Sequence, residues 1–213
     1  MADIQTTKTM KDTAYEAIKE GIVSGEWSGG TFLSEKYLSE LLQMSKTPIR
    51  SALDRLEMIG LVKLSPKQGV IVQEISLKKI LEIYELRLAL ETFAAKQMTG
   101  KLDDTFFMLM DRNLEQQAEA VKQEDVGLYV RLDREFHEMI VRGLGNDEFT
   151  EAMSRIQDKF LIAVRTTFVK NKKRLWGSLE EHIRIREALT ARDVVRTEQL
   201  IAAHIEFVKT VLL

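Results

Sequence analysis

The prolines of this chain are confined to its first third, and this most limits what the chain can fold into. Pro48 and Pro66 are the only two, and six of the eleven glycines also lie before residue 76. The 138 residues from 76 to 213 contain no proline and show long apolar periodicities. Because proline breaks helices and glycine favours turns, the sequence predicts a turn-rich N-terminal domain over residues 1–75 and an all-helical domain over residues 76–213.

Composition excludes several classes of protein. Apolar residues make up 45% of the chain and charged residues 30%, which is ordinary for a globular protein. Because the chain has no cysteine, disulfides, thiolate catalysis and cysteine-ligated metal sites are excluded. No stretch approaches about 18 consecutive apolar residues, and the polar start of the chain lacks the pattern of a signal peptide. We therefore expect a cytoplasmic protein with no membrane partner.

Two helices are predicted at the start of the N-terminal domain. Tyr15, Ile18 and Ile22 follow one face of the first helix, which ends near Gly25. Ser34 is placed to cap the second helix, because it directly precedes a short segment with leucines at helical spacing. Two helices of this kind are typical of a helix-turn-helix when a third follows after a short turn.

A third helix and a hairpin complete the predicted domain. Thr47 is placed to cap the third helix, and Pro48 takes the first helical position, where its missing N–H is harmless. Gly60 is placed to end this helix in a left-handed conformation. Residues 61–64 and 70–73 are predicted strands that flank a turn. Three helices and such a wing form a winged helix-turn-helix, whose third helix enters the major groove of DNA.

The C-terminal domain is predicted to be an antiparallel bundle of about six helices, which makes the chain mainly α. Ser76 is placed to cap the first of them, since apolar residues follow it at i, i+3, i+4 and i+7. Glycine, asparagine and aspartate mark most of the other boundaries. The predicted helices span residues 76–99, 103–123, 125–143, 146–170, 172–191 and 193–212.

Basic and polar residues gather where a winged helix-turn-helix contacts DNA. Residues 44–69 contain five Lys and Arg against two Asp and Glu, a local charge of +3 that the net charge of −2 conceals. Arg50 is expected to contact a base, because a guanidinium bonds bidentately to guanine, and the lysines are expected to contact phosphate. Alternatively, this is a solvated surface on which Arg50 pairs with Asp54 at i+4. The candidate DNA-binding residues are Lys36, Ser45, Lys46, Thr47, Arg50, Lys67, Gln68 and Gly69.

The three histidines form the second candidate site. Asp133 and His137 share one helical stripe at i and i+4, and His182 and His204 lie in two later helices among apolar neighbours. Three helices of a bundle are able to deliver these side chains to one point. Three nitrogens and one oxygen suit Zn, Ni, Fe or Mn better than Ca or Mg. Nothing in the spacing proves convergence, so a surface ion pair and hydrogen-bonded core histidines remain the alternative.

Two arginines lie in otherwise apolar segments of the C-terminal domain. Arg87 follows Tyr84 by three residues, and Arg165 lies within a run of mainly apolar residues. An interior arginine needs an anionic partner. For Arg87 this is either Glu91 at i+4 or a bound carboxylate ligand, and the residues alone favour a structural salt bridge.

Several segments resemble a known family. The N-terminal domain resembles the winged-helix domain of GntR-type bacterial transcription regulators, on residues 33–42, 45–53, 56–62 and 68–70. The C-terminal domain resembles the FCD effector domain of the FadR subfamily, in its shorter, VanR-like branch. The residues that carry this second resemblance are 85–91, 133–137, 181–182, 188–193 and His204.

The resemblance implies a function for both candidate sites. Asp133, His137, His182 and His204 would bind a divalent metal, with zinc as the first candidate and Ni, Mn or Fe as others. A small carboxylate effector would dock on the metal with help from Arg87, and Arg165 is a further candidate for effector binding. The protein would act as a homodimer on palindromic, double-stranded operator DNA.

We therefore expect a transcription regulator, most simply a repressor, whose operator affinity is controlled by a small carboxylate at a metal site. It is not expected to be an enzyme. One alternative is a metal-dependent enzyme in which the Asp and His residues activate water or hold iron. A second is a metal sensor without an organic ligand, and a third is a purely structural role for the four residues.

Overall fold

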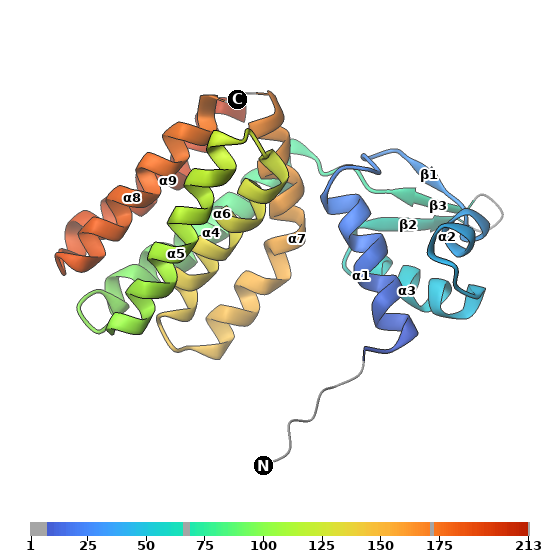
Figure 1. The fold of residues 1–213 in the computed structure, drawn as a ribbon, viewed down its shortest axis with the longest axis horizontal. Coiled ribbons are helices and arrows are strands. Elements are labelled where there is room, and N and C mark those ends of the chain that lie inside the picture. The colour runs from blue at the N-terminus through green and yellow to red at the C-terminus, as the bar shows by residue number, and fades with distance from the viewer. Residues whose placement is uncertain (1–7, 66–68, 171–172, 213) are drawn as a thin grey trace, which may run out of the picture. The chain divides into compact units, whose positions relative to one another are not determined.

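The computed structural model describes residues 8–65, 69–170 and 173–212. Contacts between residues divide the chain into two compact units, Met1–Ile75 and Ser76–Leu213 (Figure 1). The described residues are mainly helical, and the predicted winged helix-turn-helix and helical bundle are both confirmed.

The described part of the N-terminal unit contains helices and a small antiparallel sheet. In chain order its elements are α1 (Met10–Val23), β1 (Phe32–Leu33), α2 (Glu35–Leu42), α3 (Lys46–Met58), β2 (Val62–Ser65) and β3 (Gly69–Val72). Strand β3 lies between β1 and β2, with Ile71 opposite both Phe32 and Lys63. The side chains of Leu33, Val62 and Val70 are buried.

Two predictions for this unit need correction. The third helix begins at Lys46 and its N-cap is Ser45, not Thr47. Pro48 is therefore the third helical residue, which the helix tolerates because its first four N–H groups lack a helical partner in any case. Strand β1 was not predicted, because two residues are too few to show an alternating pattern. Residues 66–68 of the predicted turn lie outside the described residues.

Other local predictions for the N-terminal unit are confirmed. Ser34 caps α2, and its Oγ accepts a hydrogen bond from the backbone N–H of Tyr37 at 3.0 Å. Gly60 follows α3 with a φ of 71°, the left-handed conformation that glycine adopts without strain. Helix α1 packs on α3, and Arg55 of α3 contacts both Asp12 and the ring of Tyr15.

The C-terminal unit is a bundle whose helices agree with the predicted spans to within one or two residues at each described end. They are α4 (Leu77–Met98), α5 (Asp104–Lys122), α6 (Val126–Arg142), α7 (Asp147–Lys170), α8 (Lys173–Thr190) and α9 (Val194–Leu212). Helix α4 packs against α6, α7 and α9, while α8 packs against α5 and α9. Figure 1 shows these helices side by side along the bundle.

Capping residues explain where several of these helices start. The predicted cap Ser76 accepts a hydrogen bond from the N–H of Lys79 at 3.2 Å. Asp103 accepts one from the N–H of Phe106 at 2.8 Å. At the start of α6, Asp125 accepts one from the N–H of Leu128. Each cap satisfies a backbone donor that has no partner within its helix.

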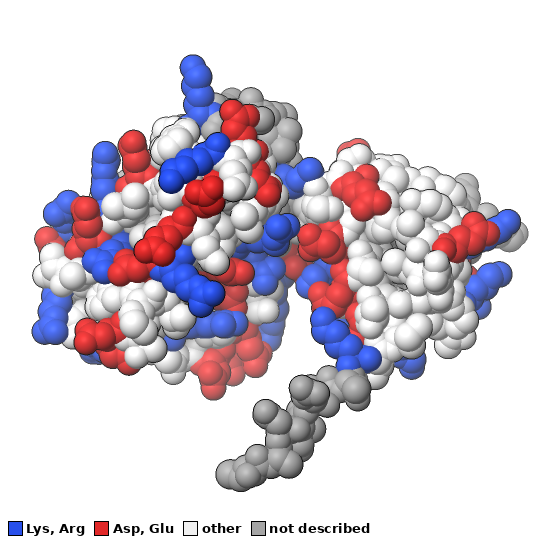
Figure 2. Space-filling view, in the orientation of Figure 1, with Lys and Arg blue, Asp and Glu red and all other residues white. Residues whose placement is uncertain are grey.

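The surface of the protein is mixed in charge. Figure 2 shows Lys and Arg interspersed with Asp and Glu over the visible face of the C-terminal unit, and a larger uncharged area on the visible face of the N-terminal unit. Among the helices of the described residues, none has the length and apolar character that crossing a membrane requires.

Gly21 provides a test of packing in the N-terminal unit. Alanine normally stabilises a helix by about 1 kcal/mol relative to glycine. A Cβ at Gly21, however, would lie 2.6 Å from Cζ3 of the buried Trp27 ring. Overpacking of this kind destabilises by about 1–3 kcal/mol. We therefore expect Gly21→Ala to lower the free energy of unfolding, as measured by guanidinium denaturation.

Gly127 in α6 supplies the matched control. A Cβ there would meet its nearest neighbour, Asp125 Oδ1, at 3.4 Å, which is an ordinary contact. Gly127→Ala is expected to leave the stability unchanged or to raise it by up to about 1 kcal/mol. Equal effects of the two substitutions would contradict the assigned packing of Trp27.

Candidate metal centre and nucleic-acid interface

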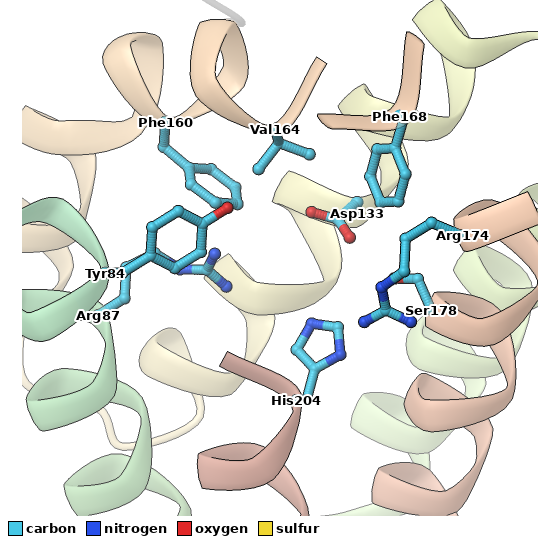
Figure 3. Close-up of a pocket in the computed structure, with 9 residues that line it drawn as sticks. All are labelled: Tyr84, Arg87, Asp133, Phe160, Val164, Phe168, Arg174, Ser178 and His204. Carbon is cyan, nitrogen blue, oxygen red and sulfur yellow. The ribbon is translucent and has the colours of Figure 1, made fainter. Parts of the chain in front are cut away.

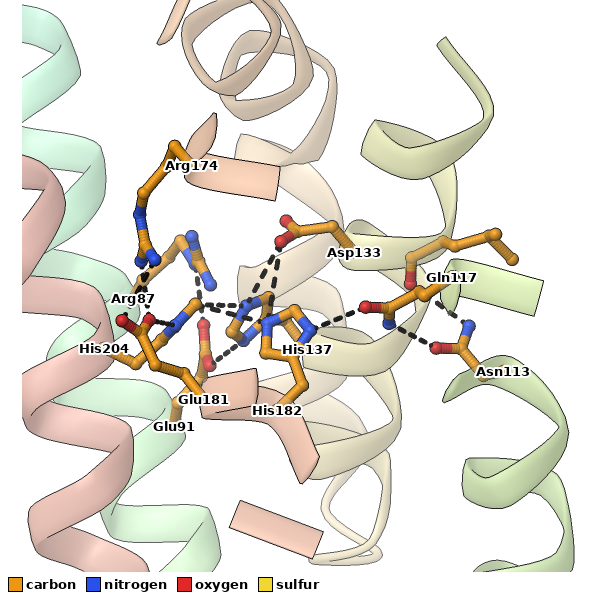
Figure 4. Close-up of polar contacts among 11 residues, drawn as sticks. Arg87, Glu91, Asn113, Gln117, Asp133, His137, Arg174, Glu181, His182 and His204 are labelled. Carbon is orange, nitrogen blue, oxygen red and sulfur yellow. Dashed lines mark hydrogen bonds and ion pairs between the residues drawn. The ribbon is translucent and has the colours of Figure 1, made fainter. Parts of the chain in front are cut away.

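Four side chains from three helices meet at one buried point of the C-terminal unit (Figure 4). Helix α6 supplies Asp133 and His137, α8 supplies His182 and α9 supplies His204. Each of these residues is at most 5% exposed. One ligand atom from each residue lies within 4.8 Å of the other three. The structure thus brings together the four residues that the sequence singled out.

The histidines face one another through their Nε2 atoms. Nε2 of His204 lies 3.1 Å from Nε2 of His137 and 3.3 Å from Nε2 of His182. Oδ1 of Asp133 lies 3.6 Å from Nε2 of His182 and 4.0 Å from Nε2 of His137. Three ring nitrogens and one carboxylate oxygen therefore point to a common centre.

The opposite ring nitrogen, Nδ1, of each histidine contacts a side-chain oxygen. These oxygens belong to residues that sequence reasoning did not assign to the site, apart from Glu91 as a partner of Arg87. The three pairs are His137 with Glu91 at 2.6 Å, His182 with Gln117 at 2.8 Å, and His204 with Glu181 at 2.6 Å. Because these oxygens accept hydrogen bonds, the proton of each neutral ring lies on Nδ1.

This tautomer tests whether the residues fit a metal ion. With the proton on Nδ1, each Nε2 presents a lone pair and has no hydrogen to donate to its neighbour. Lone pairs that face one another at 3.1–3.3 Å repel. A cation at the centre turns this repulsion into three coordinate bonds, and outward hydrogen bonds from Nδ1 are typical of metal-binding histidines. The donor set therefore fits a divalent metal.

A chain of amides fixes the partner of His182. The backbone carbonyl of Leu132 can only accept, and it accepts from Asn113 Nδ2 at 3.1 Å. Oδ1 of Asn113 then accepts from Gln117 Nε2 at 2.7 Å. This leaves Oε1 of Gln117 as the atom that faces His182, so the orientation of both amides follows from the hydrogen bonds. Asn113 and Gln117 are both buried.

Two arginines hold the carboxylates that contact the other histidines. Nε of Arg87 donates to Glu91 at 2.7 Å, and both residues are buried. Nη1 and Nη2 of Arg174 donate to the two oxygens of Glu181 at 3.0 and 2.6 Å. The expected salt bridge of Arg87 with Glu91 is present, and Arg174 is an arginine that sequence reasoning missed. Its signal was its position seven residues, or two helical turns, before Glu181.

Burial shifts the pKa values of the candidate ligands. It lowers the pKa of His137 and His182 well below the usual range, and that of His204 is lowered although Glu181 opposes the shift. Burial also raises the pKa of Asp133 to about 7, against the effect of Arg87. The histidines are thus neutral near pH 7, as metal ligands must be, whereas Asp133 is half protonated without a metal.

A small cavity of about 20 Å³ is lined by two of the four candidate ligands, Asp133 and His204. Figure 3 shows Arg87 and Arg174 on opposite sides of it, with Asp133 and His204 between them. Arg87 Nη2 and Tyr84 Oη are buried and have no hydrogen-bond partner among the described residues. The remaining lining residues are Phe160, Val164, Phe168 and Ser178. Arg165, which the sequence suggested for effector binding, is half-buried on α7 and does not line this cavity.

The candidate DNA-binding residues of α3 are exposed at its N-terminal end. Ser45, Lys46, Thr47 and Arg50 face solvent, whereas the intervening Pro48 and Ile49 are buried. Helical spacing therefore separates a core face from a polar face within the first two turns. An exposed helix N-terminus with these side chains is suited to contact DNA.

Ion pairs modify the basic surface that the sequence predicted. Nε of Arg50 donates to both oxygens of Glu35 in α2, at 2.9 Å each, so its hydrogen-bond partner is Glu35 and not Asp54. Nζ of Lys36 lies 3.8 Å from Oε1 of Glu40, and the Lys36 side chain is largely exposed. Gly69 begins β3 with a φ of 105°. Two further candidates, Lys67 and Gln68, lie outside the described residues.

Several known proteins are similar to this chain. An uncharacterized HTH-type transcriptional regulator of Bacillus subtilis, YdhC, is 27% identical over 89% of this chain and 85% of its own length. The gluconate operon transcriptional repressor of B. subtilis is 35% identical over 62% of this chain, a match that spans 53% of that protein. The structure of E. coli McbR/YncC has the same fold, with a TM-score of 0.84, 22% identity, and coverage of 97% of this chain and 98% of that one.

Two protein families account for most of the chain. The gntR family of bacterial regulatory proteins matches residues 10–72, which include the N-terminal winged helix-turn-helix. The FCD domain matches residues 82–207, which include all four candidate metal ligands. The chain therefore belongs to the GntR family of bacterial regulatory proteins, in the group with a C-terminal FCD domain, and is a DNA-binding transcription regulator.

Proposed function

We propose that this protein is a metal-dependent repressor whose operator affinity is controlled by a small carboxylate bound in the cavity beside the metal. Asp133, His137, His182 and His204 hold the metal. The observation that carries this proposal is the convergence of three Nε2 lone pairs on Asp133, each fixed by an outward hydrogen bond from Nδ1. A repressor role is supported by the name of the gluconate operon relative.

Zinc is the first candidate for the metal, and Ni, Mn and Fe also suit three nitrogens and one oxygen. A metal that accepts five or six ligands keeps open positions after binding these four residues. Held by Asp133, His137, His182 and His204, the metal would supply Lewis acidity toward a carboxylate in the adjoining cavity.

The cavity supports an anionic effector. Arg87 Nη2 is a buried cationic donor without a partner among the described residues, and Arg174 faces it across the cavity (Figure 3). The volume of about 20 Å³ is close to the minimum of about 10–15 Å³ that holds one water molecule. A carboxylate with a carbon skeleton therefore has to displace side chains, and this displacement gives it different affinities for two arrangements of the bundle.

A homodimer on a palindromic operator is supported by an apolar surface on α4 and α7. Phe93 of α4 is 46% exposed and stacks on Phe149 of α7, with 5.1 Å between ring centroids. Leu86, one heptad before Phe93, is 40% exposed on the same face of α4. A twofold axis through such a surface buries it against its own copy and pairs two DNA-binding units with two half-sites.

The described residues beside the ligands offer the alternative, a metal-dependent enzyme, no carboxylate that is free to act as a general base. Glu91 and Glu181 both lie next to the ligands, but each already accepts hydrogen bonds from an arginine and a histidine. A base needs free access to a substrate proton. A metal sensor without an organic ligand differs from the proposed function in a measurable way, because its operator affinity responds to metal and to no carboxylate.

Zinc affinity is expected to depend on pH through Asp133. Its pKa of about 7 means that a proton competes with the metal below this pH, so affinity falls by about tenfold per pH unit on acidification and levels off above about pH 8. The histidines do not add to this slope near pH 7, because their pKa values are lowered and they are already neutral. Competition with a chromophoric chelator across a pH series measures this pH dependence of zinc affinity.

Asp133→Asn is the control for this pH dependence. The variant is expected to bind zinc more weakly and to lose the slope around pH 7. A slope of the same size in the variant would assign the competing proton to another group.

The response to effectors tests the proposed function as a whole. An operator is first selected from a random DNA pool, and small carboxylates are then screened against the zinc-loaded protein by fluorescence anisotropy. An active carboxylate is expected to change operator affinity by about 5–150-fold. His182→Ala is expected to abolish this response, while Ile183→Ala, an exposed neighbour on the same helix, should retain it.

Three outcomes contradict this function. Operator affinity that responds to zinc and to no carboxylate would favour a metal sensor. Turnover that His137→Ala abolishes, in a protein without DNA binding, would favour the enzyme. A wild-type protein that binds no metal would leave only a structural role for the four residues.

Arg50 and Lys46 are expected to contribute differently to operator binding. Arg50→Ala should weaken binding to the selected operator by about 1–3 kcal/mol and relax the preference at one base pair, because a guanidinium reads a base edge. Lys46→Ala should weaken all sequences alike and reduce the salt slope by about 0.9, because it neutralises a phosphate. Anisotropy titrations over a series of salt concentrations distinguish the two, and a salt-independent affinity would contradict DNA binding through this surface.

A further inference from the structure

All the charged residues that are buried in the described chain, leaving the histidines aside, belong to the network around the candidate metal centre. They are Arg87, Glu91, Asp133 and Arg174, and each is at most 7% exposed. Glu181, the partner of Arg174, is the one partly exposed member of this network, with a side-chain exposure of 28%. The net charge of this network therefore decides what the cavity can accept.

The hydrogen bonds define the charge of each member. Burial raises the pKa of Glu91, but Glu91 accepts from Arg87 Nε and from His137 Nδ1, and these two hydrogen bonds favour its carboxylate form. Glu181 likewise accepts from Arg174 and from His204, and these hydrogen bonds lower its pKa although burial opposes the shift. Both guanidinium groups are cationic.

With Asp133 deprotonated, as a metal ligand is, the side chains of the network carry one net negative charge. Two arginines contribute positive charges, and three carboxylates, with Asp133 as a ligand, contribute negative ones. A divalent metal changes the total to one net positive charge. The other residues that line the cavity are neutral, so no further side chain there compensates this charge.

From this balance we propose that the metal-loaded cavity selects a ligand with a single net negative charge. An uncompensated charge in a buried site is unfavourable, because the surroundings solvate it poorly. A monoanion restores neutrality. A dianion leaves one excess negative charge, and a neutral ligand leaves the positive charge unbalanced. This inference rests on the proposed function, since it requires the divalent metal.

Malonate and malonamate provide a matched pair of probes. They have nearly the same shape, but malonamate has an amide in place of one carboxylate and so carries one negative charge instead of two. Malonate is the better zinc chelator in water, so coordination strength alone favours it. The zinc-loaded protein, freed of excess metal, is nevertheless expected to bind malonamate about tenfold or more tightly than malonate, as measured by calorimetry.

A change in network charge should shift this preference. Glu181→Gln removes one negative charge while keeping an oxygen that accepts from His204 Nδ1. The metal-loaded network then carries two net positive charges, and the preference is expected to move toward malonate by about tenfold or more. Glu180→Gln makes the same change on an exposed neighbour and should leave the preference as in the wild type.

Arg174→Met changes the network charge in the opposite direction. With metal bound the network is then neutral, so the affinity for both anions should fall and that for neutral malonamide should rise relative to them. A structural role of Glu181 and Arg174 predicts weaker binding of all probes without a change in their order. Zinc content and circular dichroism of each variant report whether its site and fold remain intact.

Each remaining outcome overturns the proposal. A preference for malonate in the wild type, or the same order of probes in Glu181→Gln and Glu180→Gln, contradicts selection by charge while leaving the metal site intact. A zinc-loaded protein that binds neither anion contradicts it as well. A wild-type protein that takes up no zinc contradicts the metal-dependent function first, and the charge argument with it.

Discussion

The structure of the C-terminal unit depends on how three imidazoles are buried in a helical bundle. Each ring has one nitrogen that must donate and one that must accept, and burial removes the water that would otherwise do both. The outward donors are satisfied by Glu91 on α4, Gln117 on α5 and Glu181 on α8. The inward acceptors face only one another and Asp133. The site therefore connects α4, α5, α6, α8 and α9, and the proposed metal would supply the partner that the three inward nitrogens do not find among themselves.

Much of this could be predicted from sequence because it is local. The absence of proline after residue 66, the cap at Ser76 and the apolar periodicities place the helices of the bundle within one or two residues. The candidate ligand residues were found because the chain contains only three histidines and no cysteine. Prediction failed where the signal was short, as for the two-residue strand β1, or where several residues suit one role, as for Ser45 and Thr47 at the start of α3.

The residues around the ligands were harder to find, because their contacts join distant parts of the chain. Gln117 precedes His182 by 65 residues, and Glu91 precedes His137 by 46. A buried glutamine has no distinctive spacing on its own helix, so nothing local marks Gln117 as a histidine partner. Arg50 shows the same limit at shorter range, since the i+4 rule suggested Asp54 whereas the fold of α2 against α3 provides Glu35.

The two proposed activities meet in α4. This helix carries Arg87 and Glu91, and only four residues separate its start at Leu77 from the end of β3 at Val72. An effector that binds Arg87 Nη2 contacts the same side chain that donates to Glu91. Glu91 in turn contacts His137, so the effector is connected to a candidate metal ligand. In the proposed function, metal and effector are therefore linked by shared contacts, so each would strengthen or weaken the binding of the other by the same factor.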